Sequence, residues 1–553
     1  MLLAALALLA GLGMREPVPP DEPRFVLAAR QMVESGQWLF PHRGSELYAE
    51  KPPMFMWLQA LAYQAVGDWK AAFLLPSLLA ALLTLWLTHD LARRLWGRRA
   101  ARHAALALFV CLQFGLQAKR GQIDVVLVAM TTASLWALLR YLLEKPDWRL
   151  LATGAFMAGL GTVTKGVGFL PLLVLVPALA LRFAYRAGPP PTVRSGWHAL
   201  AALAGFAAGA GVWLAPMLWA VQASQDPALQ AYAGEMLWKQ TGTRYANAWH
   251  HVKPAWYYLQ VIATLWLPGA LLLPWLLPAW WRRLRRGDSR IILLLGWSAL
   301  VLLFFSASPG KREVYIFPML PALCVAAAPL LPGLLRRSAV RWALATYLAV
   351  LAAVAVLVAA LLLLDGSGAL QRQALQRGMD AASMRHFSVW LLGFGALALA
   401  LLGWARLRRV GIAVVLATAA LWASYGLGLA PAINADSSGQ ALMRRVGQRI
   451  GPDAQLGLLG WREQLLLQAD RPALDFGFKR GWQQQWQQAG PWLQAEPQRR
   501  WLLVLEQAMA PCVEQRLAIA MGTSSRRQWW LVPGTAVSGD CAVGLSPGES
   551  END

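Results

Sequence analysis

Charged side chains of both signs gather in a few short segments of this 553-residue chain. In the first segment Asp21 and Glu22 are adjacent, follow the first apolar run and open a long polar loop. Carboxylates at the edge of an apolar region cost free energy, so they are candidates for chemistry or binding. The other segments are Glu50-Lys51-Pro52; Lys119, Arg120 and Asp124; Thr164-Lys165-Gly166; Tyr245, His250, His251 and Lys253; and Gly310-Lys311-Arg312 with Tyr315.

These residue types together suit a substrate with a phosphate head and an apolar tail. Lysine and arginine would neutralise the phosphate, and the carboxylates would handle a hydroxyl, an amine or a developing cationic sugar. Local roles remain open, because Asp21 could cap a helix, Asp124 could cap one or pair with Arg120, and Lys165 could be a snorkelling lysine.

A metal site is a further alternative. Glu50 with the adjacent His250 and His251 would suit Zn²⁺, but adjacent histidines lack the i,i+4 spacing of helical metal sites. The sequence also has no CxxC motif. We therefore expect that no cofactor is required. Cys512 and Cys541 lie in the polar tail and could pair if that tail is outside the cytoplasm.

The composition indicates which elements must position these residues. Hydrophobic residues make up 57% of the chain and charged residues 14%, and the mean hydropathy is positive, which is typical of a multispanning helical membrane protein. The net charge of +22 comes mostly from arginines in short loops between apolar runs, so it indicates topology and not a nucleic-acid partner.

Apolar runs predict about thirteen spans, from the roughly 20 residues that a helix needs to cross a bilayer. The first run is short for a span and lacks the charged start and cleavage site of a signal peptide, so we expect a missing N-terminal extension or a mis-set start. The predicted spans lie near 1–14, 70–89, 103–118, 123–141, 150–164, 167–183, 198–221, 256–281, 290–307, 314–333, 340–364, 387–405 and 410–431.

Alternate loops are richer in arginine, and these should be cytoplasmic. The loops 15–69 and 222–255 then lie outside, in the periplasm. Segments 25–33 and 54–61 of the first of these loops read as short amphipathic helices on the membrane surface. We expect a transmembrane domain over 1–431 and a small soluble periplasmic α/β domain over 432–553.

The order of several motifs resembles that of the bacterial aminoarabinose lipid A transferases, which are similar to the protein O-mannosyltransferases and belong to the GT-C class of integral-membrane glycosyltransferases. The resemblance covers roughly residues 1–430. Its last motif replaces the more usual Gly-Lys-Leu-Pro-x-Tyr of that family. The motifs are Asp21-Glu22-Pro23-Arg24, Ser35-Gly36-Gln37-Trp38-Leu39-Phe40-Pro41, Glu50-Lys51-Pro52, Asp124, Thr164-Lys165-Gly166, Trp256-Tyr257-Tyr258 and Phe304-Phe305-Ser306 through Gly310-Lys311-Arg312-Glu313-Val314-Tyr315.

The resemblance implies that Asp21 is an essential acid of the first outer loop, that Lys51 contacts the phosphate of the donor, and that Asp124 is a second acid of the cavity. We therefore predict Asp21 and Asp124 as catalytic residues. The positions predicted to bind substrate are Glu22, Arg24, Glu50, Lys51, Lys165, Tyr245, Lys311, Arg312 and Tyr315.

The family also implies the reaction. A sugar, with 4-amino-4-deoxy-L-arabinose as the leading candidate, would move from polyprenyl (undecaprenyl) phosphate to a periplasmic acceptor such as a lipid A phosphate, at the bacterial inner membrane. Asp21 would be a general base for a hydroxyl acceptor, or would position the sugar for a phosphate acceptor. The alternatives are a protein O-glycosyltransferase, a flippase or transporter of a lipid-linked sugar, and an assembly scaffold.

Overall fold

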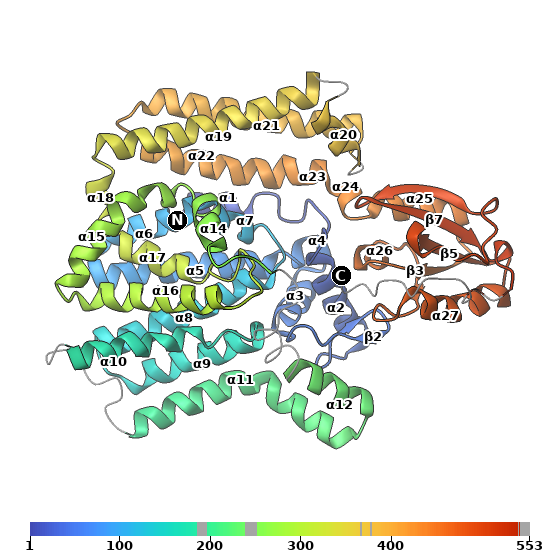
Figure 1. The fold of residues 1–553 in the computed structure, drawn as a ribbon, viewed down its shortest axis with the longest axis horizontal. Coiled ribbons are helices and arrows are strands. Elements are labelled where there is room, and N and C mark those ends of the chain that lie inside the picture. Colours follow the sequence, from blue (N-terminus) through green and yellow to red (C-terminus); the bar gives the residue numbers. More distant parts are fainter. Residues whose placement is uncertain (185–195, 238–251, 365–367, 377–378, 540, 542–553) are drawn as a thin grey trace.

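The computed structural model describes residues 1–184, 196–237, 252–364, 368–376, 379–539 and 541. Helices form most of the chain, and one five-stranded sheet lies near the C-terminus. In Figure 1 the helical body is on the left and the sheet is on the right, with helices α2 (Glu22–Ser35) and α3 (Met54–Val66) between them. The first outer loop is therefore enclosed by both parts.

Within the described residues, seven helices are long and apolar enough to cross a membrane, and an eighth span results if one bent helix pair counts as one. Their side chains are apolar almost all round, as expected of helices that face both lipid and neighbouring helices. The seven are Trp69–Trp96 (α4 and α5), Ile123–Leu143 (α8), Gly196–Ser224 (α11), Ser289–Ala307 (α16), Ser338–Leu364 (α19), Ala381–Ala405 (α21) and Val410–Ala432 (α22 to α23).

The predicted count of thirteen spans is not confirmed, because several apolar runs are broken helices. The run 103–118 is divided at Cys111 into α6 (Arg98–Val110) and α7 (Leu112–Ala118). The run 256–281 bends by 102° between α14 (Tyr257–Leu265) and the helices that follow. The two breaks meet, since Leu112 N donates to Leu267 O at 3.0 Å. Backbone groups that are freed at helix breaks can lie within a membrane when they hydrogen-bond to each other in this way. A hydropathy pattern cannot detect such breaks.

The remaining helices of the body are shorter and connect or cover these spans. The two helices predicted in the first outer loop are both present as α2 and α3. The other helices are α1 (Leu2–Leu9), α9 (Trp148–Thr164), η1 (Leu170–Val174), α10 (Leu175–Ala184), α12 (Pro227–Gly234), η3 (Gly269–Leu272), α15 (Leu273–Arg285), α17 (Met319–Ala327), α18 (Leu331–Leu334), α20 (Ala369–Gln376) and α24 (Asn434–Ser437).

The C-terminal region is built on a mixed sheet with strand order β4-β3-β5-β7-β6. Strand β3 pairs in parallel with β4 and β5, and β7 pairs antiparallel with β5 and β6. This confirms the predicted small α/β region. Its elements are α25 (Gln440–Ile450), β3 (Gln455–Leu459), α26 (Glu463–Leu467), β4 (Ala473–Asp475), α27 (Trp482–Ala495), β5 (Arg500–Leu505), β6 (Ile519–Ser524) and β7 (Arg527–Pro533).

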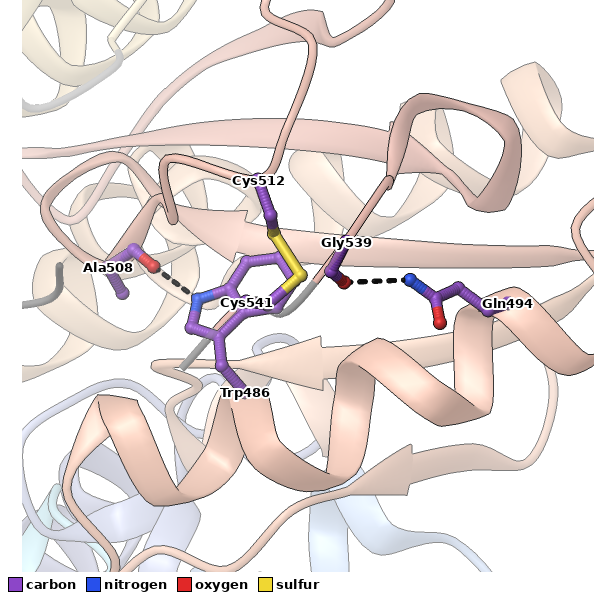
Figure 2. The surroundings of a disulfide bond; sticks show 6 residues. All are labelled: Trp486, Gln494, Ala508, Cys512, Gly539 and Cys541. Atoms are coloured by element: carbon purple, nitrogen blue, oxygen red, sulfur yellow. Dashed lines mark hydrogen bonds between the residues drawn. A yellow bond between two sulfur atoms is a disulfide. The ribbon is translucent and has the colours of Figure 1, made fainter. Parts of the chain in front are cut away.

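A disulfide joins Cys512 to Cys541 across the end of this region (Figure 2). Trp486 of α27 lies beside it and donates from its indole N–H to Ala508 O at 2.7 Å. The sequence had left this pairing open. Disulfides form and persist in oxidising compartments, so the bond is consistent with a C-terminal region outside the cytoplasm.

Removing this disulfide should destabilise the C-terminal region. The cysteines are 29 residues apart, and a loop of that length corresponds to about 2–4 kcal/mol of stabilisation through restriction of the unfolded chain. We expect a Cys512→Ser/Cys541→Ser variant to unfold its C-terminal region at a lower temperature, measured by thermal unfolding in detergent. A reducing agent should lower the Tm of the wild type only. Equal Tm values for the variant and the wild type would contradict the expectation.

Candidate active site

A cavity of about 260 Å³ lies where the first outer loop meets the ends of the membrane helices. In the described part of the chain, its lining combines six charged side chains with an apolar wall. Seven of the residues predicted from sequence are among those that line it. The polar lining residues are Asp21, Glu50, Lys51, Gln122, Asp124, Thr162, Lys165, Arg312 and Tyr315.

Asp21 precedes helix α2 at the N-cap position, but its carboxylate makes no capping hydrogen bond. Instead its Oδ2 lies 3.2 Å from Arg312 Nη2 and accepts from Gln122 Nε2 at 3.4 Å. Burial raises the pKa of the Asp21 carboxyl, but the nearby charges of Arg312, Arg24 and Lys51 outweigh it, and the pKa falls below its usual value. Asp21 is therefore an ionised carboxylate that faces cations.

Asp124 lies in the first turn of α8, and Lys165 directly follows α9. The Lys165 ammonium contacts Asp124 Oδ1 at 2.5 Å and lies 4.9 Å from the ring centre of Tyr315. The sequence had suggested Arg120 as one possible partner of Asp124. The Asp124 carboxylate pairs with Lys165 instead. Because both partners are largely buried, removing either one would leave an uncompensated charge.

Glu50 and Lys51 lie between the β1–β2 hairpin (His42–Arg43 and Glu46–Leu47) and α3. The Lys51 ammonium donates to Glu50 O at 2.9 Å. The Glu50 carboxylate pairs with Arg24 Nη1 at 3.1 Å. Among the residues that the structure describes, Lys51, Lys165 and Arg312 are the three cations that line the cavity.

Apolar side chains form another part of the lining, which we call the apolar wall. Helix α11 contributes Ala210, Trp213 and Leu214, Met236 packs in the same cluster as Trp213, and Phe25 comes from α2. The indole N–H of Trp213 donates to Leu39 O at 3.1 Å, which fixes the ring against the first outer loop. The sequence predicts the helices that carry these apolar residues. It does not predict that the apolar residues meet the charged segments in one cavity.

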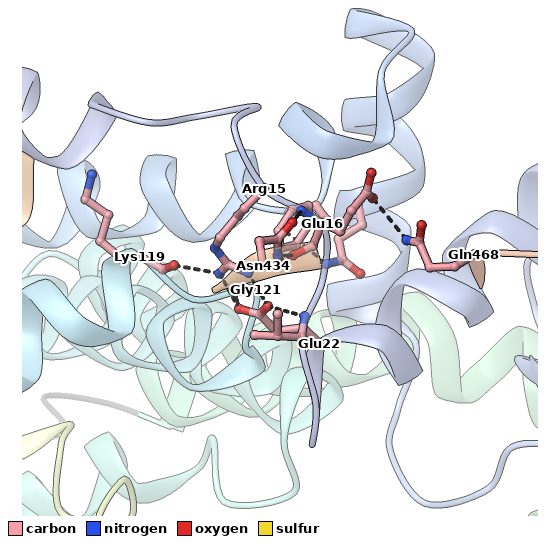
Figure 3. A network of polar contacts seen from close by, with 10 residues as sticks. Arg15, Glu16, Glu22, Lys119, Gly121, Asn434 and Gln468 are labelled. Atoms are coloured by element: carbon pink, nitrogen blue, oxygen red, sulfur yellow. Dashed lines mark hydrogen bonds and ion pairs between the residues drawn. The ribbon is translucent and has the colours of Figure 1, made fainter. Parts of the chain in front are cut away.

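Glu22 does not line the cavity, although the sequence grouped it with Asp21. Its two carboxylate oxygens bind the Arg15 guanidinium at 2.6 Å each, and Oε1 also accepts from Gly121 N at 2.9 Å (Figure 3). Arg15 in turn donates to Lys119 O. This buried network ties the start of the first outer loop to the segment before α8, and it holds Glu22 next to Asp21.

Two more predicted substrate-binding residues lie beside the cavity without lining it. Arg24 points toward the C-terminal region and pairs with Glu50 and Glu463. The Lys311 ammonium donates to Ser308 O at 2.5 Å and to Lys253 O at 3.2 Å. Lys311 therefore joins the segment after α16 to the segment before α14, and this fixes the chain next to Arg312.

The remaining predicted residues, Tyr245, His250 and His251, lie outside the described residues. Within the described part of the chain no three His, Cys, Asp or Glu side chains are grouped in a way that would hold a metal ion. Glu50, the described member of the proposed metal set, is paired with the guanidinium of Arg24 and faces that of Arg43 at 3.8 Å.

Comparisons with known proteins agree with the motifs. A family model described as dolichyl-phosphate-mannose-protein mannosyltransferase matches residues 50–216. An undecaprenyl phosphate-α-4-amino-4-deoxy-L-arabinose arabinosyl transferase from Sodalis glossinidius is 31% identical over 332 residues, which cover 59% of this chain and 58% of that protein. A protein of the same description from Pseudomonas fluorescens is 30% identical over 335 residues, covering 58% and 54%. The chain thus matches somewhat over half the length of these relatives.

Solved structures show the fold more completely. A crystal structure of ArnT from Cupriavidus metallidurans bound to undecaprenyl phosphate matches with a TM-score of 0.71 and 20% identity, covering 97% of this chain and 98% of that chain. The apo state of the same protein matches with a TM-score of 0.68, 21% identity and 97% coverage of both chains. The chain therefore has the same fold as that protein, and the resemblance inferred from its motifs is confirmed.

Proposed function

We propose that this protein is a membrane glycosyltransferase that moves 4-amino-4-deoxy-L-arabinose from undecaprenyl phosphate to a phosphate of lipid A. The observation that carries the proposal is the cavity, in which Lys51, Lys165 and Arg312 lie near three carboxylates and beside an apolar wall. Three cations suit a lipid-linked phosphate, whose oxygens accept charge-assisted hydrogen bonds. The names of the relatives from Sodalis glossinidius and Pseudomonas fluorescens include such a donor.

The cavity size fits the head of such a donor. Its volume of about 260 Å³ is below the roughly 300–1,000 Å³ of pockets that enclose drug-sized ligands. A sugar and its phosphate would therefore lie inside, and the polyprenyl chain would leave along apolar side chains. Trp213 and Leu214 of the apolar wall belong to α11, whose membrane-spanning length is mostly exposed, so this helix offers the chain a route into lipid.

The charge state of Asp21 favours a phosphate acceptor over a hydroxyl acceptor. An efficient general base has a pKa near the working pH, whereas the surroundings of Asp21, above all Arg312, lower the pKa of its carboxyl further from neutrality. A phosphate acceptor is already anionic and needs no base. We assign Asp21 to orienting the sugar and stabilising positive charge that develops at the anomeric carbon.

The transfer would be a single displacement. A phosphate oxygen of the acceptor forms a bond to the anomeric carbon while the bond from that carbon to the donor phosphate oxygen breaks, and the electron pair leaves with polyprenyl phosphate. Lys51 and Arg312 would stabilise the charge that builds up on the leaving phosphate. The Asp124–Lys165 pair would hold the sugar at the start of α8. Polyprenyl phosphate and glycosylated lipid A are the two products.

Protein O-glycosylation is the second candidate. It is favoured by the match of residues 50–216 to the mannosyltransferase model. That segment includes Lys51, Asp124 and Lys165 but not Asp21 or Arg312. The chemistry at the donor would be the same, and the acceptor would be a hydroxyl, so the acceptor distinguishes the two candidates.

We propose the bacterial inner membrane as the location, with the cavity and the C-terminal region on the periplasmic side. The arginine-rich turns at 282–290 and 336–341 lie at the end of the helical body opposite the C-terminal region (Figure 1), and positive loops favour the cytoplasm. The Cys512–Cys541 disulfide supports the same orientation. A C-terminal alkaline phosphatase fusion should be active, and an inactive fusion would contradict this orientation.

The proposed function can be tested with the purified protein in nanodiscs. Supplied with undecaprenyl phosphate-linked aminoarabinose and lipid A, it should add one aminopentose to lipid A, detected by mass spectrometry. Dephosphorylated lipid A should not react. We propose that no metal is needed, so a chelator should leave the rate unchanged. A folded protein that modifies a serine- or threonine-containing polypeptide but not lipid A would overturn the proposal in favour of the second candidate.

A further inference from the structure

A buried carboxylate of the C-terminal region reaches the first outer loop. Glu463 is the first residue of α26, and 3% of its surface is exposed. Its Oε1 contacts Arg24 Nε and Arg43 Nη2 at 2.9 Å each. The two arginines come from α2 and from the β1–β2 hairpin, more than 400 residues earlier in the chain.

The same two arginines also face Glu50. Arg24 Nη1 lies 3.1 Å from one Glu50 oxygen, and Arg43 Nη1 lies 3.8 Å from the other. Glu463, Arg24, Glu50 and Arg43 therefore form a closed ring of alternating charges, which we call the charge ring. The Arg43 guanidinium also lies 4.1 Å from the ring centre of Phe478 in the C-terminal region.

The charge ring borders the cavity through only one member. Glu50 lines the cavity, and its carbonyl oxygen accepts a hydrogen bond from Lys51, the cation predicted to contact the donor phosphate. Glu463 does not line the cavity. Its influence on the donor must therefore pass through Arg24 and Arg43, which face Glu50.

Charge balance makes Glu463 important to this arrangement. With Glu463 ionised, two carboxylates face two guanidinium groups. Burial raises the pKa of the Glu463 carboxyl, but Arg43 and Arg24 lower it by more, so it stays ionised. Without that charge, Glu50 would be the remaining carboxylate of the charge ring for both arginines and would be drawn toward them, because removing one partner of a buried ion pair is strongly disfavoured.

We propose that Glu463 is a positioning residue for the donor site, which sets Glu50 and Lys51 through the charge ring and so makes donor binding depend on the docked C-terminal region. The inference rests on the proposed function. It gives the C-terminal region a role in the transfer itself, at a distance from the reacting atoms.

The variant Glu463→Gln tests this role. We expect the KM for the lipid-linked donor to rise about tenfold, with the KM for lipid A unchanged and kcat changed less than the donor KM. Adding Arg43→Gln should bring the donor KM back toward the wild-type value, because it removes one cation for the lost anion and leaves Arg24 paired with Glu50. A purely structural contribution would not produce this recovery.

Two control variants distinguish loss of the Glu463 charge from a general weakening of the C-terminal region or of its contact with the first outer loop. Asp475→Asn weakens another contact between the same parts, since Asp475 accepts from Ser45 N at 2.9 Å and from Ser45 Oγ at 2.8 Å. Glu496→Gln removes an ion pair with Arg500 within the C-terminal region. Both should leave the donor KM near that of the wild type.

A folded Glu463→Gln protein with an unchanged donor KM would overturn the inference. If that variant does not fold, Glu463→Asp carries the test, because it keeps the charge and shortens its reach. We expect a smaller rise of about threefold, and an unchanged donor KM would again overturn the inference. Failure of the proposed function is distinguishable, because the wild type itself would then transfer no sugar.

Discussion

Replacing Asp21 by asparagine is expected to lower the rate of sugar transfer by about 10²–10³-fold, as is typical when one electrostatic contact to a transition state is removed. Asp21 is the cavity carboxylate that contacts Arg312 and is not used as a helix cap. Asparagine keeps the size and the hydrogen bond to Gln122 but removes the charge. The measurement is kcat with saturating donor and lipid A, followed by mass spectrometry.

A matched control for Asp21→Asn is Asp68→Asn in the same outer loop. Asp68 caps α4 by accepting from Lys70 N, and asparagine caps helices about as well as aspartate, so this variant should retain full activity. Full activity of folded Asp21→Asn would exclude Asp21 from the reaction.

The pH profile gives an independent check on the role of Asp21. Because the folded-state pKa of Asp21 lies below its usual value of 3.8, the carboxylate stays ionised as the pH falls from neutrality and is protonated only below that value. Wild-type transfer should therefore show no loss from Asp21 protonation between pH 5 and pH 8. A pH–rate profile in which the transfer rate falls on the acidic side near neutral pH, as for a general base, and in which Asp21→Asn removes this fall, would contradict the assignment.

The sequence predicted the cavity residues well where they lie at the ends of apolar runs. Asp124, Lys165 and Arg312 follow or begin such runs, and a charged group at that depth usually has a partner or a function. The arginine bias of alternate loops predicts that the charged segments share one side of the membrane. This is why widely separated segments could be assigned to one site from sequence alone.

Adjacent residues were harder to tell apart. Asp21 and Glu22 are neighbours, and successive residues at a helix start point about 100° apart. Which carboxylate faces the cavity is decided by Arg15 and Gly121, which hold Glu22. The partner Glu463 was not predicted at all, since it lies 439 residues from Arg24 and only the folded chain brings them together. The spacing of residues within a short segment does not predict contacts between segments that are far apart in the chain.

Replacing Lys51 by glutamine is expected to weaken the binding of undecaprenyl phosphate about 10–100-fold, because a hydrogen bond to a charged group is worth about 1.5–3 kcal/mol. Lys51 lines the cavity, and its charge is one of those that lower the pKa of Asp21. The donor phosphate gains charge as its bond to the sugar breaks, so kcat should fall by about 10²–10³-fold as well. Isothermal titration with undecaprenyl phosphate and the transfer assay measure the two effects.

Lys70→Gln is the matched control, since Lys70 is a half-exposed lysine of α4, directly after the same outer loop, and its ammonium pairs with Glu16 at 3.1 Å. It should bind and react like the wild type. Lys51→Arg should recover binding only in part, because a planar guanidinium is larger and its donors are fixed in a fork. If folded Lys51→Gln binds undecaprenyl phosphate as tightly as Lys70→Gln does, the phosphate lies elsewhere in the cavity, and Arg312 or Lys165 must hold it.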